Sequence, residues 1–132
     1  MNPFKSIKIK RTPCYGSCPV YEAEVLADGS VKYIGEMFVK KTGIHKWKLE
    51  LDKVELLNKL ICKYDYFNIE EKECSNLTSC SPSCITTIKL QDGTKRRIEN
   101  DHGNNKYPDK LKTFENRIDQ IIGSSNYTFV LL

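Results

Sequence analysis

The sequence predicts a single α+β domain over residues 1–132, in which two helices pack on one face of a mainly antiparallel β-sheet. Three observations predict this class. Short segments alternate apolar and polar residues, Asp-Gly dipeptides separate two pairs of these segments, and two longer segments carry apolar residues at helical spacing. Strands and helices follow one another in blocks, in the order ββββ-α-ββ-α-β, as is typical of an α+β layer.

The first four strands are expected at residues 5–12, 19–27, 31–35 and 44–51. In the first of them, Ile7 and Ile9 alternate with polar residues, which is the pattern of a half-buried strand. The second and third are joined by Asp28-Gly29, a strong signal for a tight hairpin turn. The residues expected on the inward face of the fourth strand are His45, Trp47, Leu49 and Leu51.

A helix is expected at residues 52–66. Asp52 and Glu55 have the spacing of a capping box at its start. Its apolar stripe, at about 100° per residue, consists of Val54, Leu57, Leu60, Ile61 and Tyr64. Cys62 falls outside that stripe, so we expect a lone thiol on the flank of the helix.

A second hairpin is expected at residues 84–91 and 95–99, around the turn Asp92-Gly93. Pro108 then fits the first turn of a second helix, and Gly123 fits its end. The apolar face of this helix is expected to consist of Leu111, Phe114, Ile118, Ile121 and Ile122. The last segment, residues 127–132, is uncharged, and we expect a strand there that either completes the sheet or pairs with another chain.

Two clusters of cysteines carry the strongest chemical signal. Each contains the spacing Cys-x3-Cys, from Cys14 to Cys18 and from Cys80 to Cys84, and Cys74 precedes the second cluster. Both clusters contain turn-forming residues and open onto an expected strand. Such a pair can close a disulfide, bind a soft metal or act as a redox couple, and the sequence leaves these alternatives open. Cys84 has the parity of the inward residues of its strand, so we expect it to face the core.

A metal site shared by the two clusters is one of these alternatives. If both hairpins start at the same rim of the sheet, the candidate ligands of a Zn²⁺ ion are Cys14, Cys18, Cys80 and Cys84, with Cys74 as a spare. The same four residues are the candidates for disulfides or for redox activity. The sequence indicates no cofactor beyond this candidate zinc ion.

No arrangement of catalytic residues stands out in the sequence. A cysteine nucleophile needs a base within reach, and the chain has two histidines, His45 and His102. His45 shares the inward face of its strand, and His102 lies in a polar turn. We therefore interpret the chain as a small non-catalytic binding or structural module with paired cysteine turns, held by disulfides or metal.

Two alternative functions remain, a zinc-binding protein and a thiol-disulfide redox protein that uses Cys14 and Cys18. In redox enzymes of this kind a helix usually follows the first cysteine and lowers its thiol pKa. Here a strand is expected after Cys18, so Lys10 or Arg11 would have to supply the activating charge.

The excess of basic residues is small, because 21 basic and 17 acidic residues give a net charge of +4. The basic runs at 40–41 and 95–97 are expected on a solvated strand face, so we do not expect a nucleic-acid partner. No stretch is long and apolar enough for a membrane span. The charged N-terminus predicts a cytoplasmic protein, or an exported one if a signal peptide was removed. A protein partner, or a homodimer formed through residues 127–132, is the expected association.

The chain resembles an uncharacterised bacterial domain family in the run Arg11–Tyr21, which reads RTPCYGSCPVY, and in the Asp-Gly hairpin that follows. The residues that match the family signature are Arg11, Thr12, Cys14, Gly16, Cys18, Pro19 and Tyr21. The resemblance covers most of the chain and implies a small α+β domain of unknown activity. The family often has an acid in a Thr-Asp-x-Pro segment before the fifth strand, where this chain has Ser79 beside Cys80.

Overall fold

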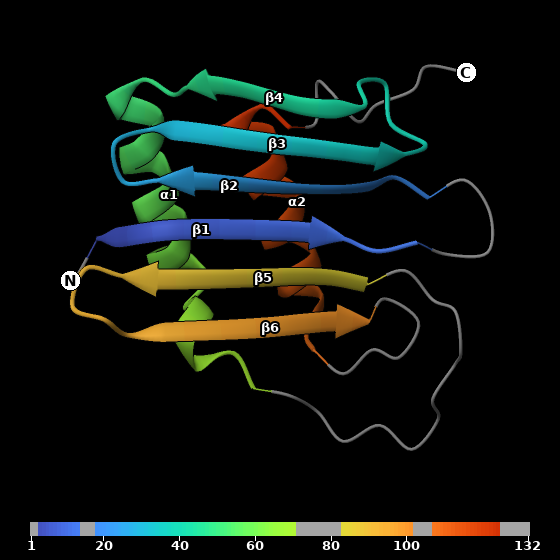
Figure 1. The fold of residues 1–132 in the computed structure, drawn as a ribbon. Helices are drawn as coiled ribbons and strands as arrows, with labels where there is room; N and C mark the ends of the chain where they lie inside the picture. Colours follow the sequence, from blue (N-terminus) through green and yellow to red (C-terminus); the bar gives the residue numbers. More distant parts are fainter. Residues whose placement is uncertain (1–2, 14–17, 71–82, 102–106, 125–132) are drawn as a thin grey trace.

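A computed structural model describes residues 3–13, 18–70, 83–101 and 107–124 of the chain. The elements in chain order are β1 (Phe4–Arg11), β2 (Val20–Leu26), β3 (Ser30–Met37), β4 (Gly43–Lys48), α1 (Leu51–Lys63), the short 3₁₀ turn η1 (Tyr66–Asn68), β5 (Ser83–Leu90), β6 (Lys95–Asp101) and α2 (Asp109–Ile122). The strands form one antiparallel sheet, and both helices lie on the same face of it (Figure 1). The predicted α+β class is confirmed, and the strand expected at 127–132 lies outside the described residues.

The strand order β4-β3-β2-β1-β5-β6 places β1 in the middle of the sheet. At the end of β1, Arg11 lies opposite Tyr21 of β2 and Cys84 of β5. Strands β2 and β5 therefore start at the same rim, which we call the loop rim. The Asp-Gly turns of both hairpins lie at the opposite rim, which we call the turn rim (Figure 1). The two hairpins thus point in the same direction, as a cysteine site shared between them requires.

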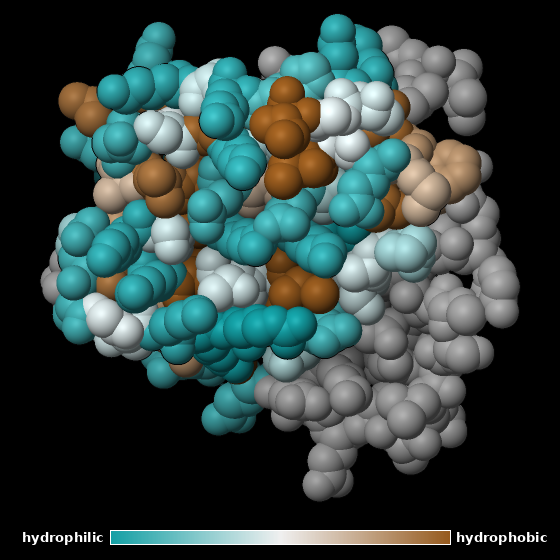
Figure 2. Space-filling model, viewed as in Figure 1, coloured by the Kyte–Doolittle hydropathy of each residue, from teal (hydrophilic) through white to brown (hydrophobic). Residues whose placement is uncertain are grey.

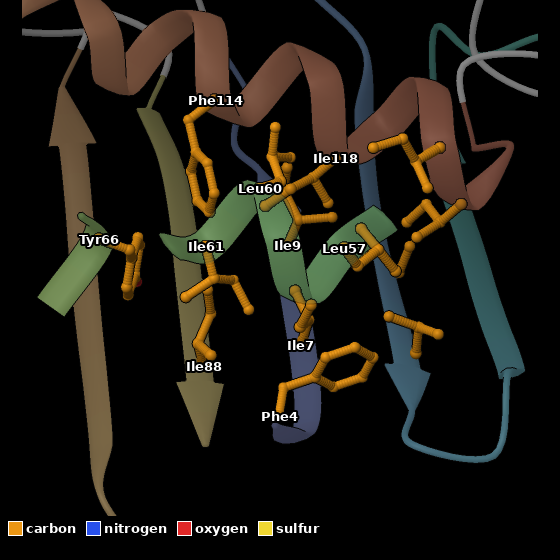
Figure 3. Packing of buried hydrophobic residues seen from close by; sticks show 14 of the residues in the cluster. Phe4, Ile7, Ile9, Leu57, Leu60, Ile61, Tyr66, Ile88, Phe114 and Ile118 are labelled. Carbon is orange, nitrogen blue, oxygen red and sulfur yellow. The ribbon is translucent and has the colours of Figure 1, made fainter. Parts of the chain in front are cut away.

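The core fills the layer between the sheet and the helices (Figure 3). Ile7 and Ile9 of β1 face Leu57 of α1 and Ile118 of α2, and each of these four side chains is at most 1% exposed. Burying a side chain of this size contributes about 1.5–3 kcal/mol to folding. The residues predicted for the stripe of α1 and the apolar face of α2 are buried, except Tyr64, which is half-buried against the core.

Strand β4 ends earlier than the sequence predicts. Trp47 and Leu49 face the core as expected, and the N–H of Leu49 donates a hydrogen bond to the Gly29 carbonyl at 2.8 Å. The backbone then turns into α1 after Glu50, which interrupts the alternation of the strand. Leu51 is therefore 73% exposed, and the prediction that it faces the core is wrong.

Both ends of α1 differ from the prediction. No capping box forms, because the N-cap is Glu50 and makes no side-chain cap hydrogen bond. Asp52 lies instead in the first turn, where a negative charge interacts favourably with the helix dipole. The helix ends at Lys63 rather than at 66, because Asp65 adopts a left-handed conformation with φ of 51°. This residue turns the chain so that Tyr66 enters the core.

The basic run 95–97 was expected on a solvated face, but only part of it lies there. Arg96 shares the inward parity of the buried Ile98. Its Nη1 donates to the Tyr66 carbonyl at 2.7 Å, and its Nη2 donates to the Ile69 carbonyl. Arg96 thus holds the end of η1 against the sheet, whereas Lys95 and Arg97 are exposed.

The two Asp-Gly turns have the same backbone geometry but different surroundings. Gly29 and Gly93 both have a φ of +94°, in the left-handed region that favours glycine. A Cβ atom added to Gly29 would lie 2.6 Å from the Leu49 carbonyl oxygen, whereas one added to Gly93 would meet no atom within 4 Å.

We expect Gly93→Ala to destabilise the chain by about 1–2 kcal/mol, which is the usual penalty for a left-handed residue with a Cβ. Gly29→Ala should have a larger effect, by about another 1 kcal/mol or more, because the Leu49 carbonyl must move as well. Urea unfolding of the two variants measures the difference. Equal effects would show that the contact with Leu49 relaxes freely.

Candidate functional site

A group of polar side chains is buried beneath the loop rim, where the core of the domain would be expected to be apolar. Arg11 continues the inward parity of Ile7 and Ile9 along β1. Glu115 and Asp119 are one helical turn apart on α2, and both point toward the sheet although they carry charge. Side chains four residues apart lie on the same face of a helix, so the two carboxylates approach Arg11 together.

Asp119 is the centre of this network. Its Oδ2 accepts hydrogen bonds from Arg11 Nη2 at 2.7 Å and from the Tyr21 hydroxyl at 2.6 Å. Its Oδ1 accepts one from the Ser124 hydroxyl at 2.5 Å. Arg11 also donates from Nε to the Tyr21 hydroxyl at 3.2 Å and from Nη2 to Asn116 Oδ1 at 3.2 Å. The centre of the sheet is thereby joined to the end of α2 by charged and neutral hydrogen bonds.

Glu115 extends the network toward β5 and β6. Its side chain is 0% exposed, and its Oε1 lies 4.0 Å from Arg11 Nη1. Its Oε2 accepts a hydrogen bond from Asn100 Nδ2 at 3.1 Å, and the Cys84 thiol is hydrogen-bonded to the same carboxyl group. Every buried side-chain nitrogen and oxygen in the described part of the chain has a partner. Each buried polar atom of the network thus has at least one partner within the protein.

The surroundings shift the pKa values of three members of the network, Tyr21, Cys84 and Arg11. Burial, reinforced by Asp119, raises the pKa of Tyr21, so its hydroxyl stays protonated and donates a hydrogen bond to Asp119. Burial also raises the pKa of the Cys84 thiol well above its ordinary value, against the opposing effect of Arg11. Burial works to lower the pKa of Arg11, but the negative charge of Asp119 beside it outweighs this effect and raises the pKa above its ordinary value. Arg11 is charged and Cys84 is a neutral thiol near pH 7.

Thr12 connects the two cysteine segments directly above this network. Its N–H donates to the Ser83 carbonyl at 3.0 Å, and its hydroxyl accepts from the Ser83 N–H at 2.8 Å. Thr12 begins the connection that leads to Cys18, and Ser83 ends the connection that leads to Cys84. The roots of both cysteine segments are thus fixed to each other at the loop rim.

The structure describes three of the six cysteines, namely Cys18, Cys62 and Cys84. Cys14, Cys74 and Cys80 lie outside the described residues. Cys18 is disulfide-bonded, and its partner is neither Cys62 nor Cys84, since both of these are free thiols.

Cys84 faces the core, as expected, and is 0% exposed. It is a free thiol in this structure, beside Glu115, and its candidate role as a disulfide partner stays a prediction. Cys62 is free and exposed on the flank of α1, as predicted.

The other predicted site residues have structural surroundings. His45 is half-buried beside the Tyr33 ring, with 5.9 Å between ring centroids, and its Nε2 lies 2.9 Å from the Thr42 carbonyl. His102 and Gly16 lie outside the described residues. Within the described ranges no three histidine, cysteine or acidic side chains are grouped so that they could hold a metal ion. The candidate zinc site, which depends on Cys14 and Cys80, stays a prediction.

Sequence reasoning missed the acidic half of the network. Glu115 and Asp119 fall one helical turn apart at the edge of the apolar stripe of α2, so the signal was their position beside that stripe. Asn100 likewise shares the inward parity of Ile98. Charged residues at a stripe edge are usually solvated, and for this reason the pattern alone does not identify them as buried.

Comparison with known proteins gives the family of the chain. The model of the family described as "Domain of unknown function (DUF6438)" matches residues 5–122, which run from β1 to the end of α2. The chain belongs to this family. A search of curated proteins found no match. Within the described residues, neither helix has the length and apolar character needed to cross a membrane.

The family match covers the whole network around Arg11 except Ser124. Two residues of the network, Arg11 and Tyr21, also match the signature on which the resemblance was based, and both lie within the matched range. In this chain they bind Asp119 from two neighbouring strands, which gives these signature positions a structural role.

We expect Asp119→Asn to destabilise the chain by about 3–5 kcal/mol, because Arg11 would remain buried without its closest counter-charge. The matched control is Asn116→Ala. Asn116 binds the same guanidinium but is exposed, so its loss should change stability by less than about 1 kcal/mol. Urea unfolding followed by circular dichroism measures both. Similar small effects for the two variants would contradict a central role for the ion pair.

The two free thiols should react very differently. In the native protein Cys62 should react with a thiol reagent within seconds to minutes, whereas Cys84 should react only as the chain unfolds. The rate of Cys84 labelling should therefore follow the denaturant dependence of unfolding. Mass spectrometry of peptides from pulse-labelled protein separates the two sites. Fast native labelling of Cys84 would show that the loop rim opens locally.

Proposed function

We propose that the chain is a non-catalytic structural or binding module that presents its cysteine-bearing connections from the loop rim. One observation carries this proposal: Thr12 and Ser83, which root the two cysteine segments, are hydrogen-bonded to each other above the network of Arg11 and Asp119. Binding residues often lie on connections that a rigid scaffold positions. The buried network supplies that rigidity from below.

The same network argues against a thiol-disulfide enzyme. A reactive cysteine needs a nearby cation or a helix N-terminus to lower its thiol pKa. The strand β2 follows Cys18, and the Arg11 guanidinium is turned away toward Asp119 with only 16% of the side chain exposed. The buried thiol of Cys84 has a raised pKa, which disfavours the thiolate. None of the described cysteines has the surroundings of a redox nucleophile.

Because Cys18 is disulfide-bonded, we favour a module whose cysteine turns are stabilised by a disulfide over one whose turns are stabilised by zinc. Zinc is bound by thiolates, and a sulfur in a disulfide is not available for this. The zinc form therefore applies to the reduced chain. It would use Cys18 together with cysteines outside the described residues.

The reduction potential of the Cys18 disulfide tests the proposal. A bracing disulfide should have a potential below about −300 mV and should not turn over insulin disulfides. We expect reduction to lower the free energy of unfolding by about 2–4 kcal/mol. Cys62→Ser serves as the control, because it removes an exposed thiol without touching the rim. A potential near that of thioredoxin, about −270 mV, together with insulin turnover, would support the redox alternative instead.

A parallel measurement addresses the zinc alternative. If the reduced chain is a zinc protein, adding Zn²⁺ should raise its melting temperature, and Cys18→Ala should abolish that increase. An oxidised chain that is more stable than the reduced chain with Zn²⁺ would favour the disulfide form.

A further inference from the structure

The face of the sheet opposite the helices is open to solvent in the described part of the chain, and hydrophilic side chains gather on it (Figure 2). One row of outward side chains runs across all six strands in register. It consists of Lys46, Lys32, Glu24, Lys8, Thr87 and Arg97, in the spatial order from β4 to β6. Neighbouring strands lie about 4.8 Å apart, so these side chains form a compact line.

Three further lysines lie two residues nearer the turn rim on the same face. They are Lys48 of β4, Lys89 of β5 and Lys95 of β6. We call these three residues, together with the row above, the basic band. It contains seven basic side chains and one carboxylate, and two of the basic side chains, Lys8 and Arg97, are paired with Glu22 and Glu99 in the adjacent row. With these two carboxylates counted, the charge is +4, which equals that of the whole chain. The positive charge of the protein is thus concentrated on this face.

The basic band contains like charges placed directly opposite each other. Lys32 of β3 faces Lys46 of β4, and Lys89 of β5 faces Lys95 of β6. Like-charged residues at directly opposed positions destabilise a sheet. Among the described residues, these four lysines make no ion pair, whereas Lys8 binds Glu22 at 2.5 Å and Arg97 binds Glu99 at 3.5 Å. The repulsion within the two pairs would be relieved by carboxylates from outside the chain.

Two acidic side chains at the edge of the band are engaged in hydrogen bonds within their own turns. Asp28 and Asp92 lie in the turns at its edge, and each accepts a hydrogen bond at 2.9 Å from a backbone N–H of its own turn. Glu24 is the single carboxylate within the band and lies between Lys8 and Lys32. The band therefore keeps a strong positive potential toward solvent.

We propose that the basic band is the docking surface for an acidic, extended segment of a partner protein. The band is made of six lysines and one arginine, which act as point charges and lack the planar fork that favours phosphate. No aromatic side chain occupies an outward strand position in the described part of the sheet, so stacking with bases is not supported.

Apolar side chains beside the band favour a polypeptide. Ile34 and Ile44 lie opposite each other, and Ile85 lies one row from Thr87 toward the loop rim. Ile44 is 62% exposed. A polypeptide that combines carboxylates with aliphatic side chains can contact both the lysines and these isoleucines, as protein interfaces commonly do.

The test uses the full chain and fluorescently labelled poly-L-glutamate as the probe, with anisotropy as the readout. The variant K46E/K95E places a carboxylate opposite Lys32 and another opposite Lys89. It should weaken binding by about tenfold or more while raising the melting temperature, because both like-charge pairs become opposite-charge pairs. The neutral variant K46Q/K95Q should weaken binding to a smaller extent. Opposite changes in binding and stability distinguish a docking surface from a structural one.

The matched control is K59E/K112E, which makes the same change in net charge at exposed positions of α1 and α2. It should change the affinity by less than about twofold, since these lysines lie on the other side of the sheet. Equal weakening by both double variants would overturn the proposal and indicate attraction by net charge alone. Tighter binding of polyuridylate, or of phosphatidylserine vesicles, than of poly-L-glutamate would also overturn it. These outcomes would assign the face to nucleic acid or to a membrane.

This inference concerns a different surface from the loop rim and does not depend on the redox state of Cys18. A chain whose disulfide is reduced should retain the basic band, because none of its residues contacts the Arg11 network. Loss of poly-L-glutamate binding on reduction, with the fold intact, would contradict that independence.

Discussion

The buried ion pair between Arg11 and Asp119 is the interaction on which the arrangement of this domain depends. It joins the central strand of the sheet to the helix that ends the described fold, across the layer in which most contacts are apolar. Because a buried charge without a partner is very unfavourable, this pair fixes the position of α2 along β1 more strictly than apolar packing could. Tyr21 and Ser124 also donate hydrogen bonds to this carboxylate, so both of its oxygens have partners within the protein.

This constraint also explains the character of the loop rim. The polar groups there have the composition of a catalytic site, with an arginine, two carboxyl groups, a tyrosine and a thiol. Their hydrogen bonds, however, are directed toward one another rather than toward an open space. An active site needs groups that are held in place and yet remain available to a substrate. Here the groups are held in place by hydrogen bonds to one another, and Thr12 and Ser83 join the ends of β1 and β5 at the rim above them.

The sheet separates two roles between its faces. On the helix-covered face, the charged side chains beneath the loop rim are buried and paired with one another. On the open face, charge is solvated and largely of one sign, toward the turn rim. Side chains alternate between the faces of a strand, so both patterns can occur in the same short segments. In β1, for example, Lys8 belongs to the basic band, whereas Ile9 and Arg11 belong to the interior.

The sequence by itself determined the secondary structure, the fold class and the inward face of most elements. Period-two alternation predicts β1, and the stripe from Val54 to Ile61 predicts α1, because water-exposed and buried faces must recur with the period of the backbone. The Asp-Gly dipeptides determined both hairpins, since glycine adopts the positive φ that these turns require. Local rules failed where the chain changes conformation within one or two residues, at Leu51 and at Asp65.

Only the tertiary structure decided which inward polar residues meet. Parity indicates that Arg11, Cys84 and Asn100 face the interior, but it gives no information on their partners, which lie on α2 about 15 to more than 100 residues away in sequence. The strand order made Arg11 the neighbour of both hairpins, and the register placed Lys32 opposite Lys46 and Lys89 opposite Lys95. These contacts depend on long-range pairing of segments, which arises from the packing of the whole sheet and is not encoded in any local pattern.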